Sequence, residues 1–323
     1  MNILVTGAAG FIGSHVSKYL CKKNYKVYGL DNISDYYDKR LKLDRLKWIK
    51  NKNFTFDQID LLDKKNLDIF ISKNNFDLVI HLAAQPGVVY SIENPFAYIE
   101  NNIMAYLNLL EICKKKKINN IIYASSSSVY GKNNKAPFEE SQKTNSPLTV
   151  YSATKITDEH ISHVYSNLFS INFVGLRFFT VFGPWGRPDM SPYIFIKKIF
   201  NNSIITLFDK GNGIRDYTYI DDVVEAIYLI VKDFDKKKQL PKNKVYNIGL
   251  GQPISTKNFL KLIEKLTKKK ARVKLEKKRK GDMETTYSNS KKFEIKYNYS
   301  FTTKTKEGLK KLLNWYSKYK LKK

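Results

Sequence analysis

Residues 2–13 read Asn2-Ile3-Leu4-Val5-Thr6-Gly7-Ala8-Ala9-Gly10-Phe11-Ile12-Gly13, a short apolar run followed at once by three closely spaced glycines. We expect a buried strand over 2–6, a tight turn, and a helix whose apolar positions continue through Leu20. Glycines let the backbone turn sharply and approach a pyrophosphate, which then lies on the N-terminal end of the helix. The stretch therefore predicts a dinucleotide-binding strand–turn–helix unit.

A second predicted strand, residues 26–30, ends at Asp31. A carboxylate at that point accepts hydrogen bonds from the adenosine ribose hydroxyls and repels a 2′-phosphate, so NAD is favoured over NADP. A turn with a capping Asp is the alternative interpretation. Asp60 ends the third strand and either meets the adenine edge or is a solvated loop residue. The residues predicted to bind the cofactor follow strand ends: Gly7, Gly10, Phe11, Ile12, Gly13, Asp31, Asn32, Asp60, Leu61, Leu82, Ala83 and Ala84.

Strand and helix patterns alternate along the first half of the chain. After the first two strands, we predict strands at 54–59, 78–81 and 171–176. Helices are predicted before and between these strands, at 41–49, 67–71, 95–116 and 151–168. This alternation predicts an α/β fold with a doubly wound, parallel Rossmann sheet.

The Gly and Pro content of residues 183–190 ends this alternation, although 217–231 again reads as strand then helix. We therefore expect two domains. Residues 1–178, with about 214–250, would form the NAD-binding domain, and about 179–213 with 251–323 a smaller α/β substrate domain. Further short strands are predicted at 272–275 and 284–287.

The net charge of +27 comes from 57 basic residues, of which only seven are Arg. The lysines occur in short runs near predicted helix ends and loops, which favours a solvated surface over a nucleic-acid partner. A nucleic-acid-binding protein stays open as an alternative, and it predicts strongly salt-dependent retention of polynucleotide.

Cys21 and Cys113 lack a paired motif and are predicted to be packed thiols. Among the histidines only His160 and His163 have metal-binding spacing, and no constellation of carboxylates accompanies them, so we expect no metal. No apolar run approaches the ~20 residues of a membrane span, and no signal-like block follows Met1, which predicts a cytoplasmic protein.

A second informative stretch runs from Ile121 to Lys155. An apolar run enters four serines, Ser125 to Ser128, as expected of a buried strand whose carboxyl end opens into a crevice. Tyr151 and Lys155 share one helical face, so the ammonium can lower the pKa of the phenol. The pair is a candidate proton-transfer site. Tyr-x-x-x-Lys alone is weak, because it also begins at Tyr19, Tyr193, Tyr228, Tyr287, Tyr316 and Tyr319.

With the glycine turn, Asp31, the serine strand end and Tyr151-x-x-x-Lys155 in order, the chain resembles the extended short-chain dehydrogenase/reductase family of nucleotide-sugar enzymes over nearly its whole length. Within that family, residues 31–37 and 176–190, the latter reading Leu-Arg-Phe-Phe-Thr-Val-Phe-Gly-Pro-Trp-Gly-Arg-Pro-Asp-Met, are similar to the UDP-glucuronate 4-epimerases.

The resemblance implies NAD-dependent 4-epimerisation through a 4-keto sugar. It implies that Tyr151 is the base, that Lys155 lowers its pKa and holds the nicotinamide ribose, and that Ser126 binds the reacting sugar oxygen. Asn102 would lie at the junction of cofactor and substrate. The residues that the resemblance assigns to the substrate are Ser127, Ser128, Thr180, Arg187, Arg215, Arg279 and Asp282. Four of the seven arginines lie in these motifs, which suits the recognition of phosphate by a planar fork of donors.

Two features bear on the reaction and on the substrate. Dehydratases and decarboxylases of the family place acidic residues before the Val129-Tyr130-Gly131 segment, where this chain has Ser127 and Ser128, so an epimerase is favoured. Val89 stands where an Arg is common. UDP-glucose or UDP-N-acetylglucosamine therefore stays open as the substrate, and a non-catalytic NAD-binding redox sensor is the alternative of another class.

The helices predicted at 95–116 and 151–168 are long and amphipathic. Their apolar stripes face the core in one interpretation. In the other they also pair with their copies across a two-fold axis, which predicts a homodimer.

Overall fold

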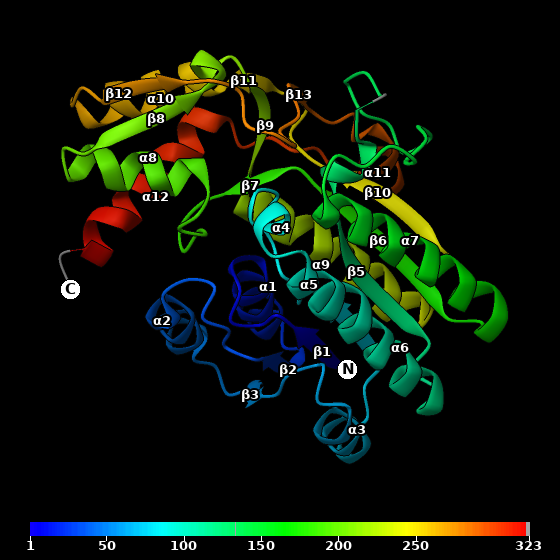
Figure 1. The fold of residues 1–323 in the computed structure, drawn as a ribbon. Coiled ribbons are helices and arrows are strands. Elements are labelled where there is room, and N and C mark those ends of the chain that lie inside the picture. The colour runs from blue at the N-terminus through cyan, green and yellow to red at the C-terminus, as the bar shows by residue number, and fades with distance from the viewer. Residues whose placement is uncertain (133, 321–323) are drawn as a thin grey trace.

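The computed structural model describes residues 1–132 and 134–320. Its centre is a seven-stranded parallel sheet, coloured from blue to yellow in Figure 1, with the strand order β10-β6-β5-β4-β1-β2-β3. The strands are β1 (Asn2–Thr6), β2 (Lys26–Asp31), β3 (Phe54–Gln58), β4 (Leu78–His81), β5 (Asn120–Ser126), β6 (Asn172–Phe178) and β10 (Lys244–Ile248). The order reverses between β1 and β4, and ligands bind at such a reversal, beyond the carboxyl ends of the strands. The predicted fold class is confirmed.

Helices cover both faces of this sheet: α1 (Phe11–Lys22), α2 (Lys39–Ile49), α3 (Lys64–Lys73), α6 (Ala105–Lys115), α7 (Val150–Phe169) and α9 (Ile220–Lys237). Successive strand residues point to opposite faces. Ile3 and Val5 accordingly pack into one core with apolar residues of α1 and α9, whereas Leu4 packs into a second core with α3 and α6. The sheet is therefore buried on both sides, as its almost uninterrupted apolar strands predict.

The remaining elements form a smaller lobe, at the upper left in Figure 1. Strands β7 (Thr180–Phe182), β9 (Ile214–Tyr219), β11 (Pro253–Ser255) and β13 (Thr285–Thr286) make one small sheet, and β8 (Ile204–Phe208) pairs with β12 (Arg272–Glu276) in another. The helices of this lobe are α8 (Ser191–Phe200), α10 (Thr256–Thr267) and α12 (Thr305–Lys320), and α11 (Lys291–Tyr297) packs beside β10.

The strand and helix expected over 217–231 are present as β9 and α9, but they separate. β9 pairs within the smaller lobe, whereas α9 packs on α1 and leads to β10 of the large sheet. The chain thus returns to the large sheet at about residue 220 rather than 214. The division into two domains stays a prediction.

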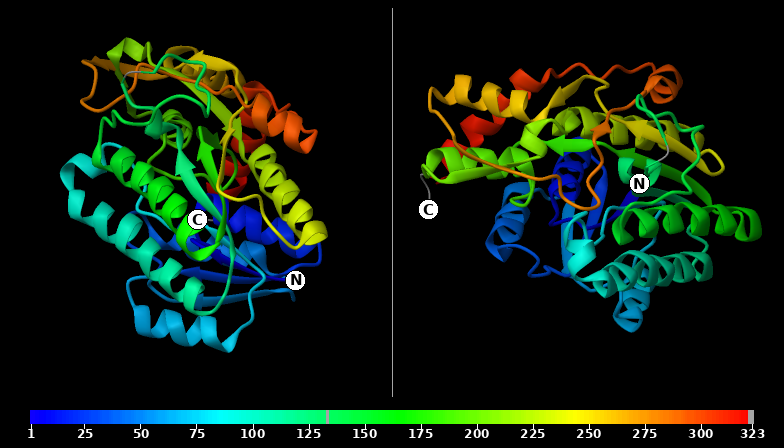
Figure 2. Two further views of the ribbon diagram at one scale, coloured as in Figure 1. Left: turned by 90° about the vertical axis from the view of Figure 1, so that its right-hand side faces the viewer. Right: turned by 45° about the horizontal axis from the view of Figure 1, so that its top comes forward.

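The helix expected over 95–116 is broken into α5 (Pro95–Tyr98), a π-helical turn η1 (Ile99–Met104) and α6, after a short α4 (Tyr90–Glu93). Such π turns are common beside functional sites. Here the turn carries Asn102, whose buried side chain bonds both backbone groups of Gln85. α5 and η1 lie along α7 on the outside of the molecule (Figure 2).

Cys21 and Cys113 are buried free thiols, as expected. Among the described residues, no helix has the length and apolar character needed to cross a membrane. Nor do three or more His, Cys, Asp or Glu side chains gather there in a metal-binding arrangement.

Candidate active site

A cavity of about 970 Å³ lies between the carboxyl ends of the large sheet and the smaller lobe. Its walls include the turns after β1, β2, β4 and β5, the start of α7, and segments around residues 180–217 and 278–286. A large concave site at this position is where an α/β fold binds its ligands.

At two glycines of the turn after β1, neighbouring backbone atoms leave no room for a side chain. Gly7 has a positive φ of 72°, and a Cβ there would lie 2.7 Å from the Ala83 nitrogen. A Cβ at Gly13 would lie 2.1 Å from the Gly7 oxygen. The backbone therefore forms a smooth cradle before the N-terminus of α1, into which a pyrophosphate fits.

Asp31 caps the turns beside it, as the alternative interpretation of this residue predicted. It also lines the cavity. Its Oδ2 accepts the Ala9 N–H at 3.1 Å and its Oδ1 accepts the Ile33 N–H at 2.8 Å. A carboxylate has about four acceptor sites, so two remain for ribose hydroxyls. The buried Lys42 ammonium lies 4.0 Å from Oδ1 and donates to the Ser34 hydroxyl at 2.8 Å.

Of the fifteen residues predicted to bind the cofactor, fourteen line the cavity. Asn32 also donates to Asp60 at 2.9 Å, which joins the ends of β2 and β3. Asn102 differs, because it lies fully buried behind the wall. It binds Gln85 and donates to the Thr154 hydroxyl at 3.0 Å, so it fixes the cavity-lining turn after β4 to α7.

Ser126, Tyr151 and Lys155 all line the same cavity, although 25 or more residues separate Ser126 from the other two. Ser126 ends β5, and its Oγ accepts the Ser128 N–H at 3.1 Å. Thr149 and Ser152 form a capping box at the start of α7, which places Tyr151 in the first helical turn. The Tyr151 and Tyr98 rings make a T-shaped contact, with 6.0 Å between their centroids.

Lys155 is 2 % exposed and forms an ion pair with Asp158, with 2.9 Å between Nζ and Oδ2. Nothing in the sequence distinguishes Asp158, because an acid on a long helix is usually solvated. Its Oδ1 is buried and accepts no hydrogen bond from the described residues. Burial raises the pKa of Asp158 from 3.8 to about 6, although the Lys155 ammonium opposes the rise.

We expect this carboxyl to impose an acid limit on activity. Because its pKa is raised, Asp158 is charged above pH 6 and takes up a proton as the pH falls through 6, which leaves the Lys155 ammonium without its anion. In the wild type kcat/KM should fall by about tenfold from pH 7 to pH 5. Asp158→Asn should lack that decline, and Asp233→Asn, on α9 and outside the cavity wall, should retain it. Identical pH profiles for all three proteins would contradict the role of Asp158.

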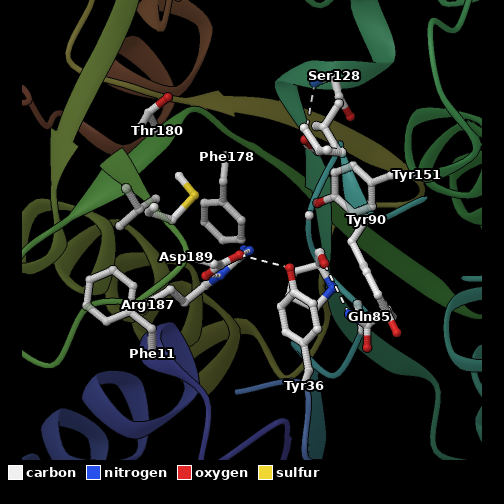
Figure 3. A pocket seen from close by; sticks show the side chains of 18 of the residues that line it. Phe11, Tyr36, Gln85, Tyr90, Ser128, Tyr151, Phe178, Thr180, Arg187 and Asp189 are labelled. Carbon is white, nitrogen blue, oxygen red and sulfur yellow. Dashed lines mark hydrogen bonds and ion pairs between the residues drawn. The ribbon is translucent and has the colours of Figure 1, made fainter. Parts of the chain in front are cut away.

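The seven residues predicted to bind substrate also line the cavity. Arg187 donates from Nε to Asp189 Oδ1 at 3.0 Å, and Asp189 Oδ2 accepts the Tyr36 hydroxyl at 3.1 Å. Figure 3 shows Arg187 and Asp189 between Phe11 and Tyr36, with Tyr151 across the cavity. The Ser128 Oγ is buried and has no hydrogen-bond partner among the described residues. An unused donor is therefore present on a residue of the cavity wall.

Two more guanidinium groups in the cavity wall lie around one carboxylate. Asp282 lies 3.6 Å from Arg215 Nη2 and 3.9 Å from Arg279 Nε. Arg279 also lies over the Phe208 ring at 3.7 Å. These loose ion pairs leave donors free for an anionic ligand. Arg177 is different, because its two short bonds to Glu159, 2.8 and 2.7 Å, make a buried structural pair outside the cavity wall.

A dinucleotide cradle, a Ser-Tyr-Lys group at the strand ends and an arginine-lined second lobe together define an enzyme that combines a nicotinamide cofactor with an anionic substrate. A family model described as the NAD dependent epimerase/dehydratase family matches residues 3–249. The chain belongs to this family, and its cofactor is NAD. The side chains fit the cofactor, since the glycine cradle, Asp31 and Lys155 all face the cavity.

Relatives and solved structures match nearly the whole chain. Protein CapI of Staphylococcus aureus is 43% identical, and the match covers 99% of both chains. UDP-glucuronate 4-epimerase 4 of Arabidopsis thaliana is 40% identical over 99% of this chain and 76% of its own. UDP-glucuronic acid 4-epimerase from Bacillus cereus, solved with UDP-glucuronic acid and NAD, is 35% identical with a TM-score of 0.92, covering 99% and 100% of the two chains. The UDP-glucose 4-epimerase of Thermotoga maritima is 29% identical with a TM-score of 0.89, covering 99% of each chain.

Proposed function

We propose that this protein is an NAD-dependent epimerase that interconverts UDP-glucuronate and UDP-galacturonate. One observation carries the proposal: Ser126, Tyr151 and Lys155 share a cavity with Arg187, and the strand end beside them carries hydroxyls rather than carboxylates. That cavity has the chemistry to oxidise and reduce one carbinol without the extra acid that a dehydratase needs. The likeness to UDP-glucuronate 4-epimerases over the full chain supports the same substrate.

When bound, NAD would supply the hydride acceptor and donor for oxidation and reduction at sugar C4. Tyr151 removes the proton of the C4 hydroxyl and later returns one, while Ser126 holds the same oxygen. Lys155 stabilises the phenolate. The glycine cradle and Asp31 would hold the cofactor, and Arg215 and Arg279 would hold the diphosphate while the sugar turns over between the two half-reactions.

The 4-keto form of glucuronate is a β-keto acid, which can lose carbon dioxide. Hydrogen bonds from Arg187, Thr180 and Ser128 to the carboxylate would oppose that loss, because negative charge must leave these donors as carbon dioxide forms. The buried, unused Ser128 hydroxyl is consistent with such a contact.

Arg187→Ala tests this role. Since a hydrogen bond to a charged group contributes about 1.5–3 kcal/mol, kcat/KM for UDP-glucuronate should fall by about 10- to 100-fold, and the decarboxylated fraction of the product should rise. Product analysis by NMR measures both quantities. If neither changed, the carboxylate would be bound elsewhere.

The substrate itself is tested by incubating the purified protein separately with UDP-glucuronate, UDP-glucose and UDP-N-acetylglucosamine, and following the axial C4 product by NMR. We expect kcat/KM to favour UDP-glucuronate by at least about tenfold. Preference for UDP-glucose would agree with the apolar Val89 in the cavity wall and would correct the substrate. NAD binding without turnover of any of the three would support the redox-sensor alternative.

We also propose that two copies pair through the outer faces of α5, η1 and α7. Large apolar side chains are exposed there, and in order of position they are Phe96, Ile99, Met104, Val164, Leu168 and Phe169. An apolar surface shared by two adjacent long helices is self-complementary across a two-fold axis.

Leu168→Glu should convert the dimer to a monomer in light scattering, because it places a charge on the apolar face near the end of α7. Leu168 is 69% exposed, so the fold of each subunit should be unchanged. Ile295→Glu is the matched control, since Ile295 is 81% exposed on α11, an element outside the proposed interface. A wild-type monomer at working concentration, or a dimer that survives Leu168→Glu, would contradict the proposed interface.

A further inference from the structure

Arg45, on α2, is completely buried, and its guanidinium is occupied by hydrogen bonds to neutral oxygens. Nη1 donates to the Ala9 oxygen at 3.1 Å and to the Tyr37 hydroxyl at 2.6 Å. Nε and Nη2 donate to the Trp185 oxygen at 3.0 and 2.7 Å, and Nη2 also reaches the Gly186 oxygen at 3.2 Å. No carboxylate among the described residues pairs with it within 4.0 Å. A buried charge without a counter-ion is costly, so its position calls for a function.

The acceptors of Arg45 belong to the two halves of the active site. Ala9 is in the glycine turn that would hold the pyrophosphate, and its N–H is bound by Asp31. Arg45 binds the oxygen of the same residue, so the turn is held from both sides. Trp185 and Gly186 directly precede Arg187, on the wall facing the sugar. One side chain thus joins the cofactor turn to the segment that carries Arg187.

The segment around Trp185 needs such support. Trp185 has a φ of +62°, a left-handed conformation that costs free energy for a bulky residue. Two of the Arg45 hydrogen bonds end on the oxygen of this residue. The adjacent Tyr36 and Tyr37 strengthen the link, because Tyr37 accepts from Arg45 while Tyr36 donates to Asp189, the partner of Arg187.

We propose that Arg45 is a positioning residue for the sugar subsite: it holds residues 185–187 against the glycine turn and so fixes Arg187 where the sugar carboxylate binds. The inference rests on the proposed function. It predicts that loss of Arg45 weakens the binding of UDP-glucuronate, which carries the carboxylate. The binding of UDP, which Arg215 and Arg279 would hold, should not change.

Tryptophan fluorescence reports on this junction alone. The three tryptophans of the chain are Trp48, Trp185 and Trp315, and the Trp185 ring lies 5.6 Å from Trp48 and 5.2 Å from Trp315. Displacement of the Trp185 segment should therefore change the emission spectrum directly, whether or not the protein is turning over substrate.

The test is calorimetric binding to the NAD-loaded protein in a Tyr151→Phe background, which prevents turnover. Arg45→Met should raise the Kd of UDP-glucuronate by about tenfold and leave the Kd of UDP within about twofold. Its tryptophan emission should shift to longer wavelength, and it should retain less NAD on gel filtration. Arg45→Lys should rescue little, because an ammonium cannot reach all three carbonyls in fixed directions. Arg40→Met, an exposed change on the same helix, should behave as the parent.

Equal weakening of UDP and UDP-glucuronate by Arg45→Met would show a general structural role and overturn the proposal, as would unchanged binding of both. If Arg45→Met does not fold, Tyr37→Phe is the second test, because it removes one Arg45 partner. It should raise only the Kd of UDP-glucuronate, by about twofold to threefold. If Tyr37→Phe causes no selective change, the proposal is also overturned. A parent protein that binds UDP but not UDP-glucuronate would contradict the proposed substrate instead, so the two failures are distinguishable.

Discussion

Tyr151→Phe is expected to lower kcat for epimerisation by about 10²- to 10⁴-fold, the contribution of a positioned acid–base group. The change removes one oxygen and keeps the ring, whose edge-on contact with Tyr98 should persist. Binding of UDP-glucuronate should therefore change little, and the loss should appear in kcat rather than in KM. Stopped assays by NMR, together with calorimetric binding, separate the two quantities.

Tyr193→Phe is the matched control for this prediction. Tyr193 also precedes a lysine by four residues, but it packs against Trp315 and does not line the cavity. It should keep wild-type activity. If Tyr151→Phe retained more than a tenth of the wild-type kcat, the proton would be transferred by another group, and the proposed mechanism would be wrong.

Gly13→Ala is expected to abolish tight NAD binding. The new Cβ would lie 2.1 Å from the Gly7 oxygen and 2.8 Å from the Gly7 carbonyl carbon, and both are backbone atoms that cannot rotate away. The turn must shift, and overpacking of this kind costs about 1–3 kcal/mol, or about 5- to 150-fold in NAD affinity if the cost falls on the binding-competent turn. Calorimetry with NAD measures the affinity, and circular dichroism checks the fold.

Ser17→Ala, on the same helix, provides the comparison. The Ser17 Oγ is buried and has no hydrogen-bond partner among the described residues, so its removal should leave both NAD affinity and melting temperature nearly unchanged. A folded Gly13→Ala protein with NAD affinity within threefold of the wild type would exclude the proposed cradle.

Local patterns were sufficient for most of the large sheet. Six of its seven strands lie within a few residues of the predicted ranges, because each is an apolar run bounded by turns and buried in the sheet, whereas β10 was not predicted. The pattern could not place β9, since a short apolar strand fits either sheet. It also missed the π-helical turn at Asn102, whose side chain accepts a hydrogen bond from the N–H of Gln85, seventeen residues earlier.

The residues missed at the site share one property: they are charged side chains whose burial depends on distant contacts. Lys42, Arg45 and Asp158 look like ordinary surface residues in a chain with 57 basic side chains. In the structure they are 6%, 0% and 1% exposed. The only sequence signal for a buried charge is the scarcity of arginine. It was interpreted for the arginines of the family motifs and not for Arg45.

By itself, the sequence determined the local chemistry. Glycines at 7, 10 and 13 set the turn, because a side chain there would strike the backbone, and the serines after β5 supplied hydroxyls without carboxylates. Tertiary structure decided which of seven Tyr-x-x-x-Lys pairs faces the cavity and which charges are buried. The reason is distance along the chain: the Arg45 contact with Trp185 spans 140 residues, and no local pattern records a contact that exists only after the sheet has brought both ends together.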